Sequence, residues 1–190
     1  MVTIEQLAEA MVDQSGWGYF LAIGIGLLIL LLWKKPRYFT QDLWKPGKPM
    51  KAGSFFALLV IFISAQMGVQ ILFMIMELTA NQYGYTMTEA MESAGGGLDS
   101  LSMFLYVGLG APISEEILFR GVALRGMEPY GKKFAIFASS VLFGLYHGNL
   151  VQIPFAFVVG LVLGYVTVEY NIVWAIVLHM FNNLILNDTM

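Results

Sequence analysis

Two adjacent carboxylates and an arginine interrupt an otherwise apolar stretch of the chain. They are Glu115, Glu116 and Arg120, in the segment ISEEILFRG. On a helix, Glu116 and Arg120 lie four residues apart with the acid first, which is the favourable order for an ion pair. Glu115 is rotated by about 100° from Glu116 and is therefore free of that partner. The spacing predicts one paired and one free carboxylate, and leaves open which of the two faces the interior of the protein.

Two later apolar segments contribute polar side chains of other kinds. His147 ends the segment FGLYH, while HMFNN carries His179 and Asn183 on one helical face, with Asn182 beside them. Polar and ionisable groups at membrane depth are costly unless they face the protein interior or water, so each marks a candidate functional site. We expect these groups to converge with Glu115 in one buried cavity.

This set of side chains permits two kinds of hydrolytic chemistry. A carboxylate beside an imidazole can hold a water and take its proton as a general base. A second imidazole and an amide can donate to the oxyanion that forms on a peptide carbonyl. Alternatively, Glu115, His147 and His179 can ligate a divalent metal such as zinc, with one position left for water. The residue types alone do not separate the two.

The composition is that of a membrane protein. Of the 190 residues, 58% are hydrophobic and only 12% are charged, with a mean hydropathy of +0.71, whereas roughly a quarter of the residues of a soluble domain are charged. Residues 17–33 and 53–76 carry no charge, and at about 1.5 Å per residue each is long enough to cross the hydrocarbon layer. The absence of cysteine excludes disulfides, thiolate chemistry and a Cys-based zinc site.

We expect an all-α, polytopic bundle of about six transmembrane spans in one membrane domain, residues 1–190. Residues 1–16 are predicted to form an amphipathic helix at the membrane interface, and residues 98–187 the catalytic core. The predicted spans are 17–33, 53–78, a long helix over 98–127 with a joint at Ala111 before Pro112, 133–149, 151–168 and 172–187.

Two pairs of residues inside these spans bear on how the helices pack. Gly160 and Gly164 form a small-xxx-small pair, which allows helices to approach closely in lipid. Gln66 and Gln70, in the second predicted span, are a further and weaker polar set. No internal sequence repeat is found.

The charged residues predict the orientation in the membrane. All ten basic residues fall in the two loops 34–52 and 120–133, whereas the segment before Trp17 and the loop 77–99 carry acidic residues and no basic ones. By the positive-inside rule, both basic loops are cytoplasmic and the N-terminus is outside. The basic residues therefore indicate topology in a cell membrane, and no nucleic-acid partner is expected.

Three motifs, in order, resemble the signature of the CPBP family, the CAAX-protease and bacteriocin-processing intramembrane endopeptidases, also called Abi. EEILFR resembles the family's E-E-x-x-x-R motif, FGLYH its F-x-x-x-H motif, and HMFNN its H-x-x-x-N motif. Each motif alone is weak, but three in order, each in a hydrophobic segment, are specific. The resemblance covers about residues 98–187.

The resemblance implies proteolysis within the membrane and a role for each motif residue. Glu115 and His147 would activate the water, and His179 and Asn183 would stabilise the oxyanion. Glu116 and Arg120 would support the site structurally. Asn182 is also taken as a supporting residue, on its position beside His179, where it can serve either the site or a contact between helices.

The resemblance also bears on cofactor and substrate. Members of the family have been assigned both metalloprotease and metal-free, glutamate-dependent mechanisms; we favour the metal-free one, with zinc held by Glu115, His147 and His179 as the alternative. The implied substrate is a membrane-associated or prenylated peptide or protein, or a leader, pheromone or bacteriocin peptide. About six spans are fewer than eukaryotic type II CAAX prenyl endopeptidases have, which favours a bacterial branch and a prokaryotic membrane.

Two rival functions use the same residues differently. A bacteriocin self-immunity or binding protein on the same scaffold would need no proteolysis, and its mark would be the loss of a catalytic group; all the motif groups are present. A small transporter or proton relay would use the buried acid and histidines, and would predict inverted repeats, which the sequence lacks. The endopeptidase is therefore the leading hypothesis.

Overall fold

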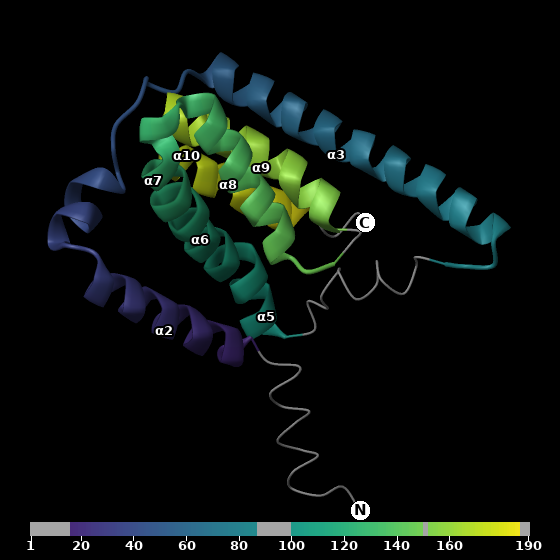
Figure 1. Ribbon diagram of the computed structural model, residues 1–190, viewed down its shortest axis with the longest axis horizontal. Helices are drawn as coiled ribbons and strands as arrows, with labels where there is room; N and C mark the ends of the chain where they lie inside the picture. Colours follow the sequence, from purple (N-terminus) through teal and green to yellow (C-terminus); the bar gives the residue numbers. More distant parts are fainter. Residues whose placement is uncertain (1–15, 87–99, 150–151, 187–190) are drawn as a thin grey trace, which may run out of the picture.

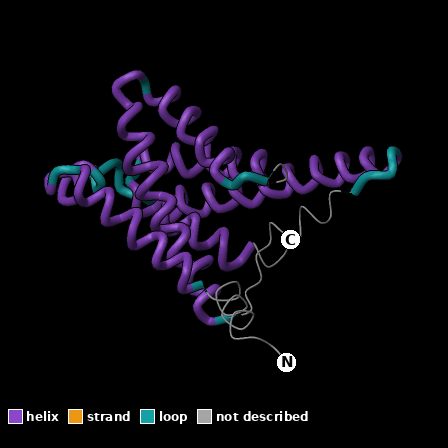
Figure 2. Tube along the Cα trace, turned by 60° about the horizontal axis from the view of Figure 1, so that its bottom comes forward, coloured by secondary structure: helices purple, strands orange, loops and turns teal. Residues whose placement is uncertain are grey.

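The computed structural model describes residues 16–86, 100–149 and 152–186. In these residues the chain is helical apart from short connections, and it contains no strand (Figures 1 and 2). This confirms the predicted all-α class. The amphipathic helix predicted for the N-terminal 16 residues falls almost entirely outside the described residues.

Two long outer helices precede a bundle formed by the second half of the chain (Figure 1). The outer helices are α2 (Trp17–Trp33) and α3 (Ala52–Gln82), with the short π-helix η1 (Tyr38–Asp42) between them. The bundle begins with a composite helix, Leu101–Tyr130, and ends with three further helical segments. Those segments are α8 (Lys132–Tyr146), α9 (Gln152–Glu169) and α10 (Ile172–Phe181), the last continued by the π-helix η5 (Asn182–Leu186).

The length and apolar composition of the helices indicate a membrane protein. Within the described residues, three helical stretches are long and apolar enough to cross a membrane: Ala52–Gln82, Leu101–Tyr130 and Gln152–Glu169. Trp17–Trp33 and Ile172–Leu184 are apolar but shorter. Each helix agrees with a predicted span to within about one turn.

The composite helix differs from prediction at Pro112. It consists of α5 (Leu101–Leu105), η2 (Tyr106–Gly110), α6 (Ala111–Glu115), η3 (Glu116–Leu124), α7 (Arg125–Met127) and η4 (Glu128–Tyr130). Ala111 is helical, with φ −61° and ψ −54°, so the joint predicted there is wrong. Proline lacks an N–H and crowds the carbonyl of the preceding turn. The wider π-helical turn of η2, directly before Pro112, accommodates that crowding without breaking the helix.

Close helix contacts hold the bundle together. A Cβ added at Gly160 would lie 3.0 Å from the Cβ of Ser140, and one at Gly164 would lie 3.1 Å from Ile136 Cγ2. These contacts confirm that the small-xxx-small pair lets α9 pack directly on α8.

The outer helices are packed much more loosely. Leu30 is the buried residue of α2, and α3 buries Leu58, Phe62 and Gln66. In Figure 1, α3 extends past the bundle at its C-terminal end, and α2 runs along the composite helix. Most of their apolar surface is therefore left for lipid.

Candidate active site

The predicted ion pair between Glu116 and Arg120 is present at the centre of the bundle. Arg120 Nη1 lies 3.0 Å from Glu116 Oε1, and both side chains have 0% exposure. Arg120 Nη2 also donates to the carbonyl oxygen of Gly160 on α9, at 3.2 Å. The pair thus ties the composite helix to α9 at Gly160, the residue at which α9 also packs closely on α8.

His179 lies between the two carboxylates. Its Nδ1 donates to Glu116 Oε1 at 2.9 Å, and its Nε2 lies 3.7 Å from Glu115 Oε2. Glu115 ends α6 and Glu116 begins η3, so their side chains leave the helix in different directions and reach opposite nitrogens of one imidazole. Glu116 is fully buried, whereas the Glu115 side chain is 14% exposed.

Phe143, the aromatic residue that begins the second motif, packs against both imidazoles of the site and against Arg120. The centre of its ring lies 4.9 Å from that of His147 and 5.7 Å from that of His179, almost perpendicular to both. The guanidinium carbon of Arg120 lies 4.4 Å from the same ring centre, within the range of a cation–π contact. Phe143 is 1% exposed, so it is a fixed support for both imidazoles and the arginine.

The hydrogen bond of His147 defines its neutral tautomer. Nδ1 lies 2.8 Å from the carbonyl oxygen of Phe143, one helical turn earlier. Since a carbonyl oxygen only accepts, Nδ1 carries the proton, and Nε2 of the neutral ring keeps a lone pair. His147 can therefore act as a base through Nε2.

The two asparagines belong to a separate hydrogen-bonded chain. Asn182 Nδ2 donates to Asn183 Oδ1 at 2.9 Å, and Asn183 Nδ2 donates to the Val107 carbonyl of η2, also at 2.9 Å. Asn182 Oδ1 accepts from Gln66 Nε2 of α3. One hydrogen of the Asn183 amide is thus used within the protein, and the second has no partner among the described residues.

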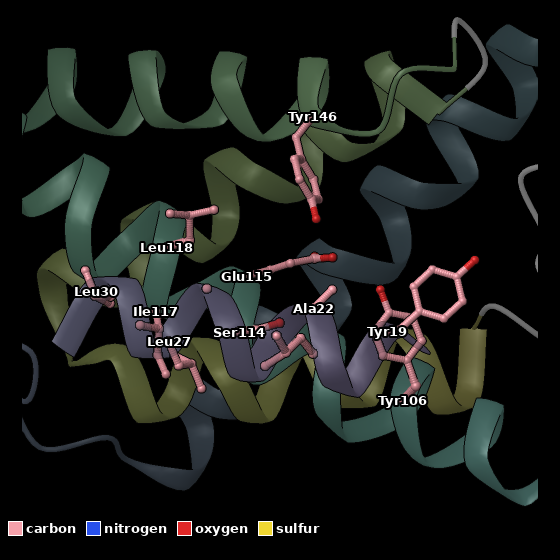
Figure 3. A pocket seen from close by; sticks show the side chains of 12 residues that line it. Tyr19, Ala22, Leu27, Leu30, Tyr106, Ser114, Glu115, Ile117, Leu118 and Tyr146 are labelled. Atoms are coloured by element: carbon pink, nitrogen blue, oxygen red, sulfur yellow. The ribbon is translucent and has the colours of Figure 1, made fainter. Parts of the chain in front are cut away.

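A cavity of about 260 Å³ opens beside Glu115 (Figure 3). Its wall combines one carboxylate with tyrosines and aliphatic side chains. The lining residues are Tyr19, Ala22, Ile23, Gly26, Leu27 and Leu30 of α2, Tyr106, Ser114, Glu115, Ile117 and Leu118 of the composite helix, and Tyr146 of α8. In Figure 3 the phenol of Tyr146 points towards the Glu115 carboxylate. Of the adjacent pair, Glu115 is therefore the acid that faces the cavity.

The tyrosines and helix α2 are site components that the sequence did not suggest. Tyr146 directly precedes His147, and that adjacency was an available signal. Tyr19 and Tyr106 stack with ring centres 4.5 Å apart and so attach α2 to η2. No pattern marks the cavity-facing side of α2, because its residues are apolar all round.

The side chains that the zinc alternative would use are not gathered into one set in this structure. Within the three described ranges, no group of three His, Cys, Asp or Glu side chains is arranged to hold a metal ion. Glu115 and His179 are neighbours, but His147 does not complete a three-ligand set with them. The metal-free mechanism and the zinc alternative, which requires that set, both stay predictions, and the steps proposed below use only side chains of the chain.

Residues 97–185 match a family model described as Rce1-like, "Type II CAAX prenyl endopeptidase Rce1-like". The matched stretch includes all three motifs and every polar residue of the site except Gln66 of α3 and Tyr19 of α2. The match confirms the resemblance to the CPBP family and supports a CAAX-protease-like membrane peptidase. Comparisons with curated proteins and with solved structures give no match.

Proposed function

We propose that the chain is an intramembrane endopeptidase that hydrolyses a peptide bond of a membrane-associated or prenylated peptide or protein. The observation that carries this proposal is the placement of Glu115. Its carboxylate lines the cavity while Oε2 lies 3.7 Å from His179 Nε2, so the acid and the imidazole can both contact one bound water or reacting group. Its neighbour Glu116 is fully buried, and its Oε1 contacts Arg120 and His179.

In the proposed mechanism, Glu115 and His147 hold the attacking water. One of them takes a proton from the water as its oxygen attacks the scissile carbonyl carbon. The carbonyl oxygen becomes an oxyanion, which accepts hydrogen bonds from Nε2–H of a protonated His179 and from the second Nδ2–H of Asn183. The captured proton passes to the leaving nitrogen, and the C–N bond breaks. Glu116, Arg120 and Asn182 keep these groups in place.

The walls of the cavity favour an apolar substrate. Ala22, Ile23, Leu27 and Leu30 of α2 face Ile117 and Leu118 across it, and Glu115 supplies the charge. An aliphatic side chain or a prenyl group beside the scissile bond suits such a lining. A prenylated C-terminus fits the matched family; leader, pheromone and bacteriocin peptides fit the same chemistry.

The predicted loop 120–133 is wrong in part, because residues 120–130 belong to the composite helix and Arg120 is fully buried. For the rest of that basic cluster, two ion pairs support the proposed orientation, in which it and the loop 34–52 are cytoplasmic and the N-terminus is outside a prokaryotic cell membrane with about six spans. Lys45 lies 3.6 Å from Glu128, and Lys48 pairs with Glu169 at the end of α9. Both contacts bring the loop 34–52 next to the region of the second basic cluster. Apart from the buried Arg120, the two clusters therefore lie on one side of the bundle, as the positive-inside rule requires.

The test is cleavage by the purified protein in detergent. Wild type, Glu115→Gln and Asp42→Asn would be incubated with a mixed library of hydrophobic and prenylated peptides, with and without chelator, and the products identified by mass spectrometry. Asp42 is exposed at the end of η1, so Asp42→Asn controls for loss of a charge. We expect products from wild type and Asp42→Asn, with or without chelator, and none from Glu115→Gln. A folded wild type that cleaves nothing would contradict the proposal and favour the immunity or binding function.

A further inference from the structure

A chain of side-chain amides runs from the outer helix α3 to the active site. Gln66 Nε2 donates to Asn182 Oδ1, Asn182 Nδ2 donates to Asn183 Oδ1, and Asn183 Nδ2 donates to the Val107 carbonyl. We propose that Gln66 is a positioning residue for the reaction: through Asn182, it holds the Asn183 amide in place at the reacting carbonyl. This inference rests on the proposed function.

The position of Gln66 on α3 is unusual for that helix. The buried residues of α3 are Leu58, Phe62 and Gln66, which recur every fourth residue, and Gln66 is only 5% exposed. Leucine or methionine at position 66 would continue the buried face of α3 without introducing a polar group. Since an amide at membrane depth is costly unless it is hydrogen-bonded, packing alone does not account for a glutamine here.

The need for such a chain follows from the shape of an amide. The NH₂ and C=O ends of asparagine have almost the same shape, and an inverted Asn183 would aim its oxygen at the oxyanion instead of an N–H. The Val107 carbonyl accepts only, and the Asn182 Nδ2 donates only, so together they select one orientation of Asn183. The Gln66 amide can itself invert and so selects no orientation, but by donating to Asn182 Oδ1 it holds the Asn182 amide against Asn183. The chain thus keeps the second N–H of Asn183 available.

The kinetic test replaces Gln66 by methionine, which keeps the length of the side chain and removes its donor. Gln70→Met is the matched control, because Gln70 lies one turn further along α3 and is exposed. We expect Gln66→Met to lower kcat by about tenfold with little change in KM, as a misplaced oxyanion donor should, and Gln70→Met to behave as wild type. Wild-type kcat in folded Gln66→Met would overturn the inference.

A double-mutant cycle separates positioning from packing. If Gln66 acts through Asn183, then Gln66→Met should cause no further loss of kcat in an Asn183→Ala background. Losses that multiply would show that Gln66 acts elsewhere and would overturn the inference. Should Gln66→Met fail to fold, Asn182→Leu breaks the same chain without altering α3, and the same cycle with Asn183→Ala decides.

A second readout does not depend on activity, so it distinguishes failure of this inference from failure of the proposed function. In protein labelled with ¹⁵N-asparagine, the side-chain amide signals of Asn183 can be assigned by their absence in Asn183→Ala. We expect these signals to shift or broaden in Gln66→Met and to stay unchanged in Gln70→Met. Unchanged signals in both variants would contradict the positioning role, whatever the protein cleaves.

Discussion

The two sides of the helix that carries Glu115 and Glu116 have opposite surroundings. On the packed side, Glu116 and Arg120 have no exposed surface and contact His179, Phe143 and the backbone of α9. On the cavity side, Glu115 faces an open space of about 260 Å³, whose far wall is the loosely attached helix α2 (Figure 3).

This contrast shows how adjacent identical residues can have different functions. Arg120 and His179 both hold Glu116 through Oε1, while its buried Oε2 has no hydrogen-bond partner among the described residues. Those two contacts fix the rotation of the helix about its axis. With the helix fixed, Glu115 cannot turn away from the cavity. The packed side therefore determines geometry, and the cavity side is left for water, substrate and chemistry.

The largest effect on stability is expected from breaking the packed side. Arg120→Leu leaves Glu116 buried without its cation, and removing one partner of a buried pair costs about 3–5 kcal/mol. We expect a large fall in the unfolding temperature in detergent. The double variant Arg120→Leu/Glu116→Leu removes both charges and should recover most of that loss. A single variant as stable as wild type would show that the pair does not hold the helix.

A smaller loss is expected where α9 packs on α8. A Cβ at Gly160 would lie 3.0 Å from that of Ser140, so Gly160→Ala must push the helices apart at a cost of about 1–3 kcal/mol. Gly24→Ala is the matched control, because a Cβ there meets nothing within 4 Å. Thermal unfolding measures both. Equal stability of the two variants would contradict the close packing of α8 and α9.

The smallest effect on stability, and one confined to binding, is expected on the cavity side. Gly26 lines the cavity, and a Cβ there meets nothing within 4 Å. A leucine at this position would occupy part of the space. We expect Gly26→Leu to raise KM by about tenfold and to leave the unfolding temperature unchanged, with Gly24→Leu as the control. An unaltered KM would indicate that substrate does not enter between α2 and Glu115.

Local patterns in the sequence predicted the helices and the ion pair well. Span boundaries depend on long apolar runs, and the contact between Glu116 and Arg120 depends only on a spacing of four residues. The π-helical turns around Pro112 were missed, because sequence spacing does not distinguish a kink from a widened turn. The predicted catalytic roles of Glu115, His147, His179 and Asn183 stay predictions.

Contacts between distant parts of the chain were the least predictable. That His179 bridges both carboxylates depends on how α10 packs against the composite helix, and motif spacing holds no information on that packing. The link from Gln66 to Asn182 joins positions 116 residues apart. The position of α2 in the cavity wall could not be predicted for a different reason. A helix that is apolar on every side gives no sequence signal for the face that it turns towards the protein.

The most direct test of the different functions of the two carboxylates compares Glu115→Gln with Glu116→Gln. Both changes keep the size of the side chain and remove one charge, and both kcat and the unfolding temperature would be measured for each variant. We expect Glu115→Gln to lose about 10²–10⁴-fold in kcat at wild-type stability, and Glu116→Gln to lose stability, with Arg120 left unpaired. A Glu115→Gln protein that cleaves at the wild-type rate would contradict the account.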